Sequence, residues 1–313
     1  MAERIALIFN PSAGGGKALR RKRKVEACLK ERDINYDLFV TESEAHLVEI
    51  AQSVVREYPV IIGAGGDTTI NLISAQILRA GTGNTLGIIS LGSVNDLARE
   101  LGVHKLEDAV DSIKSRVVRS IDVGAITTDN DIEPYYFLVS ASLGLGVAVN
   151  RYVDIWMRKH PFFSSFRSAT QGTAAMSAIH HAFKNNIVPV ELELMAQDTL
   201  HSVVSPLMVF CNIASFGGTF RPSPTAGPFN GKLDCCIFNA SSLGKIFKVS
   251  IDVKRQKHLE KDTVKVLQEE LFTIRAKEPI EFQVDGEIIQ REGDITLSAM
   301  PNSLNFFVNP ALA

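Results

Sequence analysis

Short apolar runs alternate with longer segments of helical spacing over the first third of the chain. Ile5 to Phe9 is an uninterrupted apolar run, and in Ala18 to Arg32 the apolar side chains recur at helical intervals among Lys and Arg. Strands are predicted at Ile5 to Phe9, Tyr36 to Val40, Val60 to Ile62 and Leu86 to Ser90, and helices at Ala18 to Arg32, Glu42 to Glu57, Thr69 to Ala80 and Leu97 to Lys114. This alternation predicts a doubly wound α/β domain, in which a mainly parallel sheet has helices on both faces.

Beyond Asp122 the pattern changes to β-type runs that follow one another with turn residues between them. The runs are Tyr136 to Ser142, Val190 to Met195, Val203 to Asn212, Lys232 to Phe238, Leu271 to Lys277, Ile280 to Val284 and Ile295 to Ser298, and helical segments lie at Ala148 to Lys184, broken near Pro161, and at Ser242 to Lys257. We therefore predict a C-terminal antiparallel β-sandwich domain with a helical insertion.

The domain boundary is predicted near residues 122–124, where the pattern changes. This gives an N-terminal α/β domain over residues 1–123 and a β-rich domain over residues 124–300. Residues 301–313 form a C-terminal segment. Its apolar run Leu304 to Val308 resembles the first strand and could return to the N-terminal domain.

Composition narrows the class of protein. A chain of 313 residues, 45% of them apolar, is long enough for two cores. Its net charge of -2 gives no support to nucleic-acid binding. Four cysteines lack paired metal-ligand spacing and are interpreted as reduced and structural: Cys28, Cys211, Cys235 and Cys236. No apolar stretch approaches the roughly 18 residues that span a bilayer, so we expect a cytoplasmic protein that touches membranes at their surface.

Three successive strand ends carry glycine-bearing loops, in the segments Asn10 to Lys17, Gly63 to Asn71 and Leu91 to Asp96. Glycine allows the backbone to approach a ligand closely, and the N–H groups of a following helix can bind phosphate. A tight turn also needs glycine for structural reasons alone, but three loops at one edge of a sheet favour a site. The candidate nucleotide-contacting residues are Asn10, Gly14, Gly16, Lys17, Gly65, Gly66, Asp67, Thr68, Thr69, Gly92, Ser93 and Asn95.

Carboxylates in or near these loops have several possible roles. Asp67 would be repelled by phosphates unless it acts through a divalent metal, holds the loop by hydrogen bonds, or takes a proton from a substrate hydroxyl. Asp96 could cap a helix that begins at Leu97, or belong to a site together with Asn95. Lys17 could meet a phosphate or remain solvated. Far downstream, Val284 to Glu287 has the residues of a plain Asp-Gly hairpin turn.

The order and separation of the motifs resemble those of the diacylglycerol kinase catalytic-domain family, in particular its soluble bacterial lipid kinases, whose relatives include sphingosine and ceramide kinases. The resemblance spans nearly the whole chain. Its motifs are Asn10 to Lys17, Gly65 to Asn71, Leu91 to Arg99, Ser142 to Gly146, Asn230 to Asp234 and Val284 to Glu287.

The resemblance implies transfer of the γ-phosphoryl group of ATP to a lipid hydroxyl, with Mg²⁺, in a cleft between a nucleotide domain and a lipid-binding domain. Asp67 and Asp96 would be linked to the metal through water, and Glu287, with Asp285 nearby, would be the base for the lipid hydroxyl. Asp234 corresponds to a structural Mg²⁺ site in relatives. The implied partners are a nucleotide and a lipid at a membrane surface, and a homodimer is left open.

Departures from the family pattern keep other functions open. The second motif normally reads Gly-Gly-Asp-Gly-Thr, whereas here Thr68 occupies the fourth position. A β-branched residue there would be strained if its φ were positive. Ser93 replaces a Thr, and Asn230 stands where Asp is usual. The protein could be an active lipid kinase, a kinase with another donor, or a homologue that binds lipid or nucleotide without catalysis; an NAD kinase shares the Gly-Gly-Asp turn but fits the third loop less well.

Overall fold

The computed structural model describes residues 4–159, 189–218, 220–239, 243–260, 262–276 and 278–312. These residues fall into two compact units, one formed by residues 1–121 with 302–313 and the other by residues 122–301. The chain leaves the first unit within strand β5 (Val118–Thr128) and returns to it within strand β16 (Asp294–Phe307). The first unit is therefore built from two separate segments of sequence.

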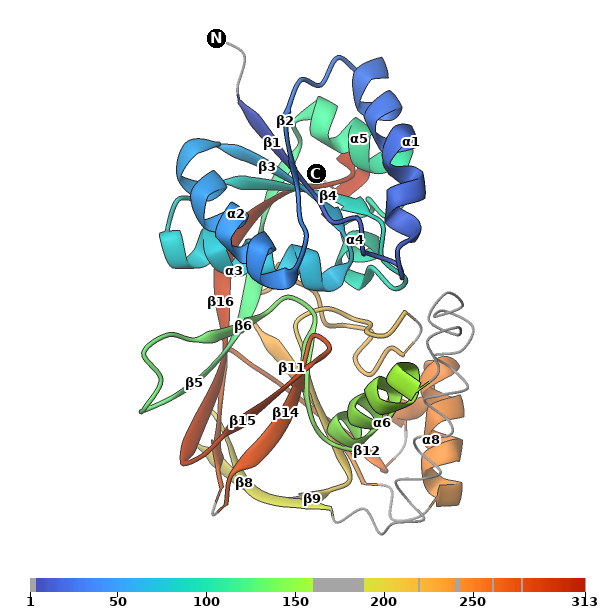
Figure 1. Cartoon of the computed structure of the whole chain (residues 1–313). Helices are drawn as coiled ribbons and strands as arrows, with labels where there is room; N and C mark the ends of the chain where they lie inside the picture. Colours follow the sequence, from blue (N-terminus) through green and yellow to red (C-terminus); the bar gives the residue numbers. More distant parts are fainter. Residues whose placement is uncertain are drawn as a thin grey trace. The chain divides into compact units, whose positions relative to one another are not determined.

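The first unit contains a parallel sheet with the strand order β2-β1-β3-β4-β16. Its own strands are β1 (Ile5–Phe9), β2 (Asp37–Val40), β3 (Val60–Gly65) and β4 (Thr85–Ser90), and its helices are α1 (Lys17–Glu31), α2 (Glu44–Glu57), α3 (Asp67–Ala80), α4 (Asp96–Glu100) and α5 (Leu106–Ser115). Helices α1 and α5 cover one face of the sheet, while α2 and α3 lie against the other (Figure 1). The predicted doubly wound α/β domain is confirmed.

Local sequence signals explain where these helices begin and end. Ser43 precedes α2, and its side chain accepts a hydrogen bond from the backbone N–H of His46. Helix α3 ends at Gly81, whose φ of 62° suits glycine. The helices predicted over Leu97 to Lys114 are α4 and α5, which are separated at Gly102, with a φ of 69°.

The second unit is a sandwich of two sheets. One sheet has six antiparallel strands in the order β12-β11-β10-β7-β14-β15, and the other contains β16-β13-β8-β9 with β5 and β6 alongside. Their bounds are β6 Tyr135–Phe137, β7 Ser140–Gly144, β8 Val190–Ala196, β9 Thr199–Ser205, β10 Leu207–Cys211, β11 Leu233–Phe238, β12 Val264–Glu269, β13 Leu271–Arg275, β14 Ile280–Val284 and β15 Glu287–Arg291. One apolar core joins side chains of both sheets, including Phe210, Phe272 and Phe282. The predicted antiparallel β-sandwich is thus confirmed.

The strand prediction at Val203 to Asn212 is wrong. This run is divided at Pro206 into β9, which belongs to one sheet, and β10, which belongs to the other. The chain crosses between the sheets here: the Pro206 carbonyl accepts a hydrogen bond from the N–H of Leu145, and the Ser205 hydroxyl donates to the Leu207 carbonyl. Proline has no N–H to continue a strand ladder, which explains the break.

The last strands also differ from expectation. The runs predicted at Ile295 to Ser298 and Leu304 to Val308 are parts of the one 14-residue strand β16. Its first half pairs with β13, and its Asn305 and Phe306 pair in parallel with Thr85 and Leu86 of β4. Strands β5, β12 and β15 were not predicted at all.

Among its described residues, the second unit has the α-helices α6 (Leu145–Lys159) and α8 (Leu243–Lys254). The part of the predicted helical segment from residue 160 to Lys184 lies outside the described residues. Within the described ranges, no helix combines the length and the apolar character needed to cross a bilayer. All four cysteines are free and buried, as expected of structural thiols.

Candidate functional site

The three glycine loops meet at the carboxyl ends of β1, β3 and β4. The side-chain amide of Asn10, in the first loop, donates to the Thr69 hydroxyl in the second at 2.9 Å. The carbonyl of Gly65, in the second loop, accepts the backbone N–H groups of Leu91 (2.7 Å) and Gly92 (3.1 Å) in the third. Parallel strands bring their ends to one edge, and these bonds fix the loops to one another there.

The glycines allow the loops to approach this closely. A Cβ atom at Gly92 would lie 2.6 Å from the Cα of Gly66, and one at Gly14, whose φ is 62°, would lie 2.6 Å from the Leu91 carbonyl oxygen. A Cβ at Gly65 would lie 2.3 Å from the Thr69 hydroxyl. Each distance is shorter than real Cβ contacts, so these positions tolerate no side chain.

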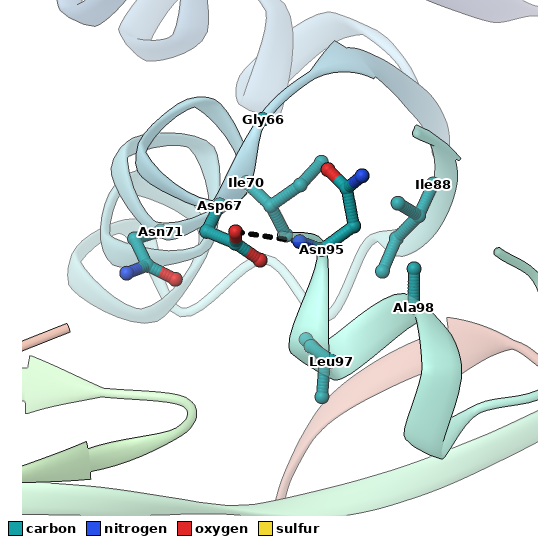
Figure 2. A pocket seen from close by; sticks show the side chains of 8 residues that line it. All are labelled: Gly66, Asp67, Ile70, Asn71, Ile88, Asn95, Leu97 and Ala98. Carbon is teal, nitrogen blue, oxygen red and sulfur yellow. Dashed lines mark hydrogen bonds between the residues drawn. The ribbon is translucent and has the colours of Figure 1, made fainter. Parts of the chain in front are cut away.

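Asp67 holds the third loop. One carboxylate oxygen accepts the N–H of Asn95 at 2.8 Å (Figure 2), and the other accepts the N–H of Asp96 at 3.1 Å. Of the roles considered for this side chain, loop holding is the one that its contacts display. Burial raises the pKa of Asp67 above its ordinary value, although these backbone N–H groups act in the opposite direction.

A small cavity lies beside Asp67, with a volume of about 10 Å³. Figure 2 shows the side chains around it, which come from β4, α3, α4 and the loops before the two helices: Gly66, Asp67, Ile70, Asn71, Ile88, Asn95, Leu97 and Ala98. It has room for about one water molecule. Any nucleotide bound at these loops would have to lie outside this cavity.

Of the two interpretations of Asp96, capping of a helix that begins at Leu97 does not hold. Helix α4 begins at Asp96 itself, and the cap position is held by Asn95, with a φ of 56° that Asn tolerates better than most residues. The Asn95 side-chain amide donates to the Gly92 carbonyl at 3.0 Å. The carboxylate of Asp96 is only 4% exposed and lies 3.6 Å from the Arg99 guanidinium.

Thr68 carries no backbone strain. It is the second residue of α3, its φ is not positive, and the residue is exposed. The position that is usually glycine in the family thus has ordinary helical geometry here, and a threonine fits it.

The other predicted loop residues lie at the same edge. Gly16 precedes α1 with a φ of 82°, and the exposed Lys17 is the first residue of that helix. Ser93 is partly buried in the third loop, next to Gly92. All the predicted nucleotide-contacting residues therefore belong to the three loops or to the first turns of the helices that follow them.

Asp285 and Glu287 belong to the second unit, at the hairpin between β14 and β15. Val284 pairs with Glu287, so Asp285 and Gly286 form a two-residue turn, with φ values of 46° and 99°. Positive φ at both positions is the geometry of a type I′ turn, which favours Asp-Gly. The Asp-Gly hairpin turn predicted from these residues is therefore present, and it places Glu287 at the first position of β15.

The two carboxylates of this hairpin have different surroundings. Asp285 accepts the backbone N–H groups of Leu138 (2.7 Å), Val139 (3.1 Å) and Ser140 (2.8 Å), which ties the turn to the start of β7. Glu287 is exposed, and one of its oxygens accepts a hydrogen bond from the Tyr135 hydroxyl at 2.5 Å. Asp285 thus positions the turn, whereas Glu287 is presented to solvent.

Asp234 has no features of a metal ligand. This side chain is 1% exposed and accepts hydrogen bonds from the Ser223 hydroxyl, the Thr225 hydroxyl (3.2 Å) and the Gln268 side-chain amide (2.8 Å). Neutral donors therefore surround the carboxylate on both oxygens. A cation would have to displace them, so the residues present do not fit a structural Mg²⁺ at Asp234.

Tyr135 is the residue of this site that sequence reasoning missed. It lies 152 positions before Glu287, and no motif includes it. In the described parts of the chain, no group of three or more His, Cys, Asp or Glu side chains could hold a metal by itself.

Two family models match the chain and together define its class. A model described as the diacylglycerol kinase catalytic domain matches residues 4–126, and one described as the YegS C-terminal NAD kinase beta sandwich-like domain matches residues 140–308. The first covers the three glycine loops, and the second covers the sandwich. This is a kinase fold of two joined domains. The chain belongs to the family of proteins that combine a diacylglycerol kinase catalytic domain with a YegS-type C-terminal sandwich domain.

Curated relatives support the same assignment over almost their full length. The chain is 23% identical over 296 residues to the diacylglycerol kinase of Bacillus subtilis (strain 168), which covers 91% of this chain and 90% of the relative. It is 26% identical over 313 residues to the diacylglycerol kinase of Mycobacterium tuberculosis (strain ATCC 25618 / H37Rv), with 96% and 94% covered.

Solved structures show the same fold. A protein from Bacillus anthracis strain Sterne, provisionally named a diacylglycerol kinase, superposes with a TM-score of 0.79 at 22% identity, over 99% of this chain and 97% of the other. An NAD kinase from Archaeoglobus fulgidus in complex with ATP superposes with a TM-score of 0.55 at 14% identity, over 98% and 94%.

Proposed function

We propose that this protein is an ATP- and Mg²⁺-dependent lipid kinase that transfers the γ-phosphoryl group to a hydroxyl of diacylglycerol or a related lipid. The observation that carries the proposal is the junction of the three glycine loops, made by the bonds of Asn10, Gly65 and Asp67. The ATP in the distantly similar NAD kinase and the names of the curated relatives support the donor and the acceptor class.

The loops would bind the nucleotide phosphates through their backbone. Phosphoryl transfer requires mainly positioning and charge neutralisation, which N–H groups at helix N-termini provide. Gly66 and Gly92 are so close that no side chain can come between these two loops. By holding Asn95 and Asp96, Asp67 would keep this surface in one geometry before the nucleotide arrives.

Asp67 and Asp96 are the residues that would hold Mg²⁺, directly or through water. Each Asp67 oxygen accepts one N–H group and keeps lone-pair capacity, and Mg²⁺ commonly uses one or two carboxylates together with substrate phosphates. The ion would neutralise phosphate charge. The Asp67 carboxylate is thus chemically suited to Mg²⁺, unlike that of Asp234, and Asp96, whose carboxylate also lies 3.6 Å from the Arg99 guanidinium, would contribute beside it.

Glu287 would be the general base for the lipid hydroxyl. It is exposed, whereas the neighbouring carboxylate of Asp285 is engaged by three backbone N–H groups. A base must be reachable by its substrate, so we assign the proton transfer to Glu287 and a positioning role to Asp285. Because such lipids reside in bilayers, the enzyme would work at a membrane surface.

The test is phosphorylation by the purified full chain with labelled ATP and Mg²⁺, presenting diacylglycerols, sphingoid bases and NAD in separate reactions. We expect a labelled lipid, and we expect Glu287→Gln to lower kcat by at least about 100-fold with ATP affinity nearly unchanged, because the amide keeps the shape but cannot take the proton. Glu191→Gln, an exposed Glu on strand β8, is the matched control and should behave as wild type.

No lipid product with Mg²⁺ or Mn²⁺ would overturn the proposal. Label in NAD alone would assign the protein to the other activity of this fold. Full activity of Glu287→Gln would remove Glu287 from the mechanism while leaving the lipid kinase assignment in place.

A further inference from the structure

One oxygen of Glu287 is already engaged in the described structure. The Tyr135 hydroxyl donates to Oε2 at 2.5 Å, although the two residues come from different strands of different sheets, β6 and β15. Among the described residues, no hydrogen bond or ion pair reaches the other oxygen, Oε1. The exposed carboxylate therefore has one held oxygen and one oxygen open to a substrate.

The surroundings of Tyr135 keep its hydroxyl protonated, so that it can donate a hydrogen bond. Burial first, and then the hydrogen bond to Glu287, raise the pKa of Tyr135 far above its ordinary value, so the hydroxyl keeps its proton at any working pH. The guanidinium of Arg291 lies 5.9 Å from the centre of the tyrosine ring, and its Nε donates to Asp131 at 3.1 Å. Arg291 thus packs beside the ring while its own charge is paired elsewhere.

The hairpin that carries Glu287 is fixed independently of Tyr135. Asp285 ties the turn to the backbone of residues 138–140, and the Asn150 side chain, on α6, donates to the Gly286 carbonyl at 2.8 Å. The backbone of Glu287 is therefore held from two sides. What remains to be fixed is its side-chain rotamer, and the Tyr135 hydroxyl is the only described group that bonds to it.

We propose that Tyr135 is a positioning residue for catalysis, which holds Oε2 of Glu287 so that Oε1 faces the acceptor hydroxyl. This inference rests on the proposed function. It adds Tyr135 to the residues that support catalysis, with an effect exerted through the base Glu287. In the step, Oε1 takes the proton of the lipid hydroxyl while the hydroxyl oxygen forms a bond to the γ-phosphorus. The bond from that phosphorus to the bridging oxygen breaks, ADP leaves with the electron pair, and Glu287 later returns its proton to water.

A fixed carboxylate loses less freedom on reaching the transition state, so removing the donor should lower the rate without weakening nucleotide binding. We expect Tyr135→Phe to lower kcat about 10-fold, the effect of about one charge-assisted hydrogen bond, with the KM for ATP within about twofold of wild type.

The experiment compares kcat and the KM for ATP of wild type, Tyr135→Phe, Glu287→Gln and the double variant in the lipid phosphorylation assay. Tyr135→Phe keeps the ring and its packing, and Tyr136→Phe removes a hydroxyl from the neighbouring residue as the matched control. If Tyr135 acts through Glu287, the double variant should be no slower than Glu287→Gln alone.

Each outcome decides one point. A slower Tyr135→Phe with an unchanged KM for ATP, together with a non-additive double variant, supports the inference. An inactive Glu287→Gln beside a Tyr135→Phe with the kcat of wild type overturns it while the proposed function stands. A Tyr135→Phe whose KM for ATP also rises, or an additive loss in the double variant, also overturns it, because a purely structural defect would behave in that way.

Discussion

At the residue scale, Thr68 shows that a departure from a family motif can be read wrongly when the backbone is unknown. The family glycine suggested a position that needs a positive φ, which a β-branched residue would resist. In the structure this position is the second residue of α3, with no positive φ, and its side chain is exposed. The substitution therefore gives no structural reason to expect a distorted loop.

A direct test is Thr68→Gly. We expect ATP affinity, measured by calorimetry, to stay within about twofold of wild type, and the free energy of unfolding to fall by up to about 1 kcal/mol, because glycine costs more backbone entropy in a helix. Thr68→Ser, which keeps the hydroxyl, is the control. An ATP affinity that rises 10-fold or more only in the glycine variant would instead mean that the threonine obstructs the nucleotide, and would favour a homologue that has lost catalysis.

At the element scale, the second and third glycine loops pack directly against each other, backbone against backbone. A Cβ at Gly92 would lie 2.6 Å from the Cα of Gly66 and 2.7 Å from the Asn95 side-chain oxygen. Backbone atoms cannot move aside as a flexible side chain can, so a methyl group here should push the second and third loops apart.

Gly92→Ala should therefore lower the free energy of unfolding by about 1 to 3 kcal/mol, as overpacking does, and weaken ATP binding at least 10-fold. Denaturant unfolding and calorimetry measure the two effects. Gly227→Ala is the matched control, because nothing lies within 4 Å of the added methyl group and the φ of Gly227 is not positive. Normal ATP binding by Gly92→Ala would show that the contact between the loops is not required for the site.

Features of the fold and of the site could be predicted from the sequence where neighbouring residues determine them. Features that depend on contacts between distant residues could not. Apolar runs that end in glycines predicted the strands and loops of the first unit, and Asp-Gly between β-type runs predicted the turn at Asp285. The split at Pro206 was missed because the apolar run continues through it, although proline is a strand-breaking signal. The bond from Tyr135 to Glu287 depends on the pairing of distant strands, and nothing local to either residue indicates it.

At the scale of the whole molecule, two buried thiols should make the free energy of unfolding decrease at alkaline pH. Burial raises the pKa of Cys211 and of Cys235 well above the ordinary value, and both side chains are 1% exposed or less. Because the folded pKa lies above the unfolded one, their contribution to stability is complete below the unfolded pKa of about 8.5 and is lost as pH rises past it.

We expect the free energy of unfolding, measured in urea between pH 7 and 10.5, to fall above about pH 8.5, with each of these thiols contributing about 1.4 kcal/mol per pH unit. The double variant Cys211→Ala, Cys235→Ala should have a lower stability at pH 7, because of the cavities, but a shallower alkaline slope. An unchanged slope would show that other groups control the alkaline transition.

The first unit cannot be completed until strand β16 has been synthesised. Phe306 and Phe307 are 0% and 1% exposed in that unit, yet a ribosome makes them only after every residue of the sandwich. Until then, the side of β4 that pairs with β16 has no partner, and the apolar slot for these two phenylalanines is unfilled. The first unit can therefore be completed only after β16 has been translated, and a ribosome that stalls within the sandwich would leave an open sheet edge exposed to aggregation.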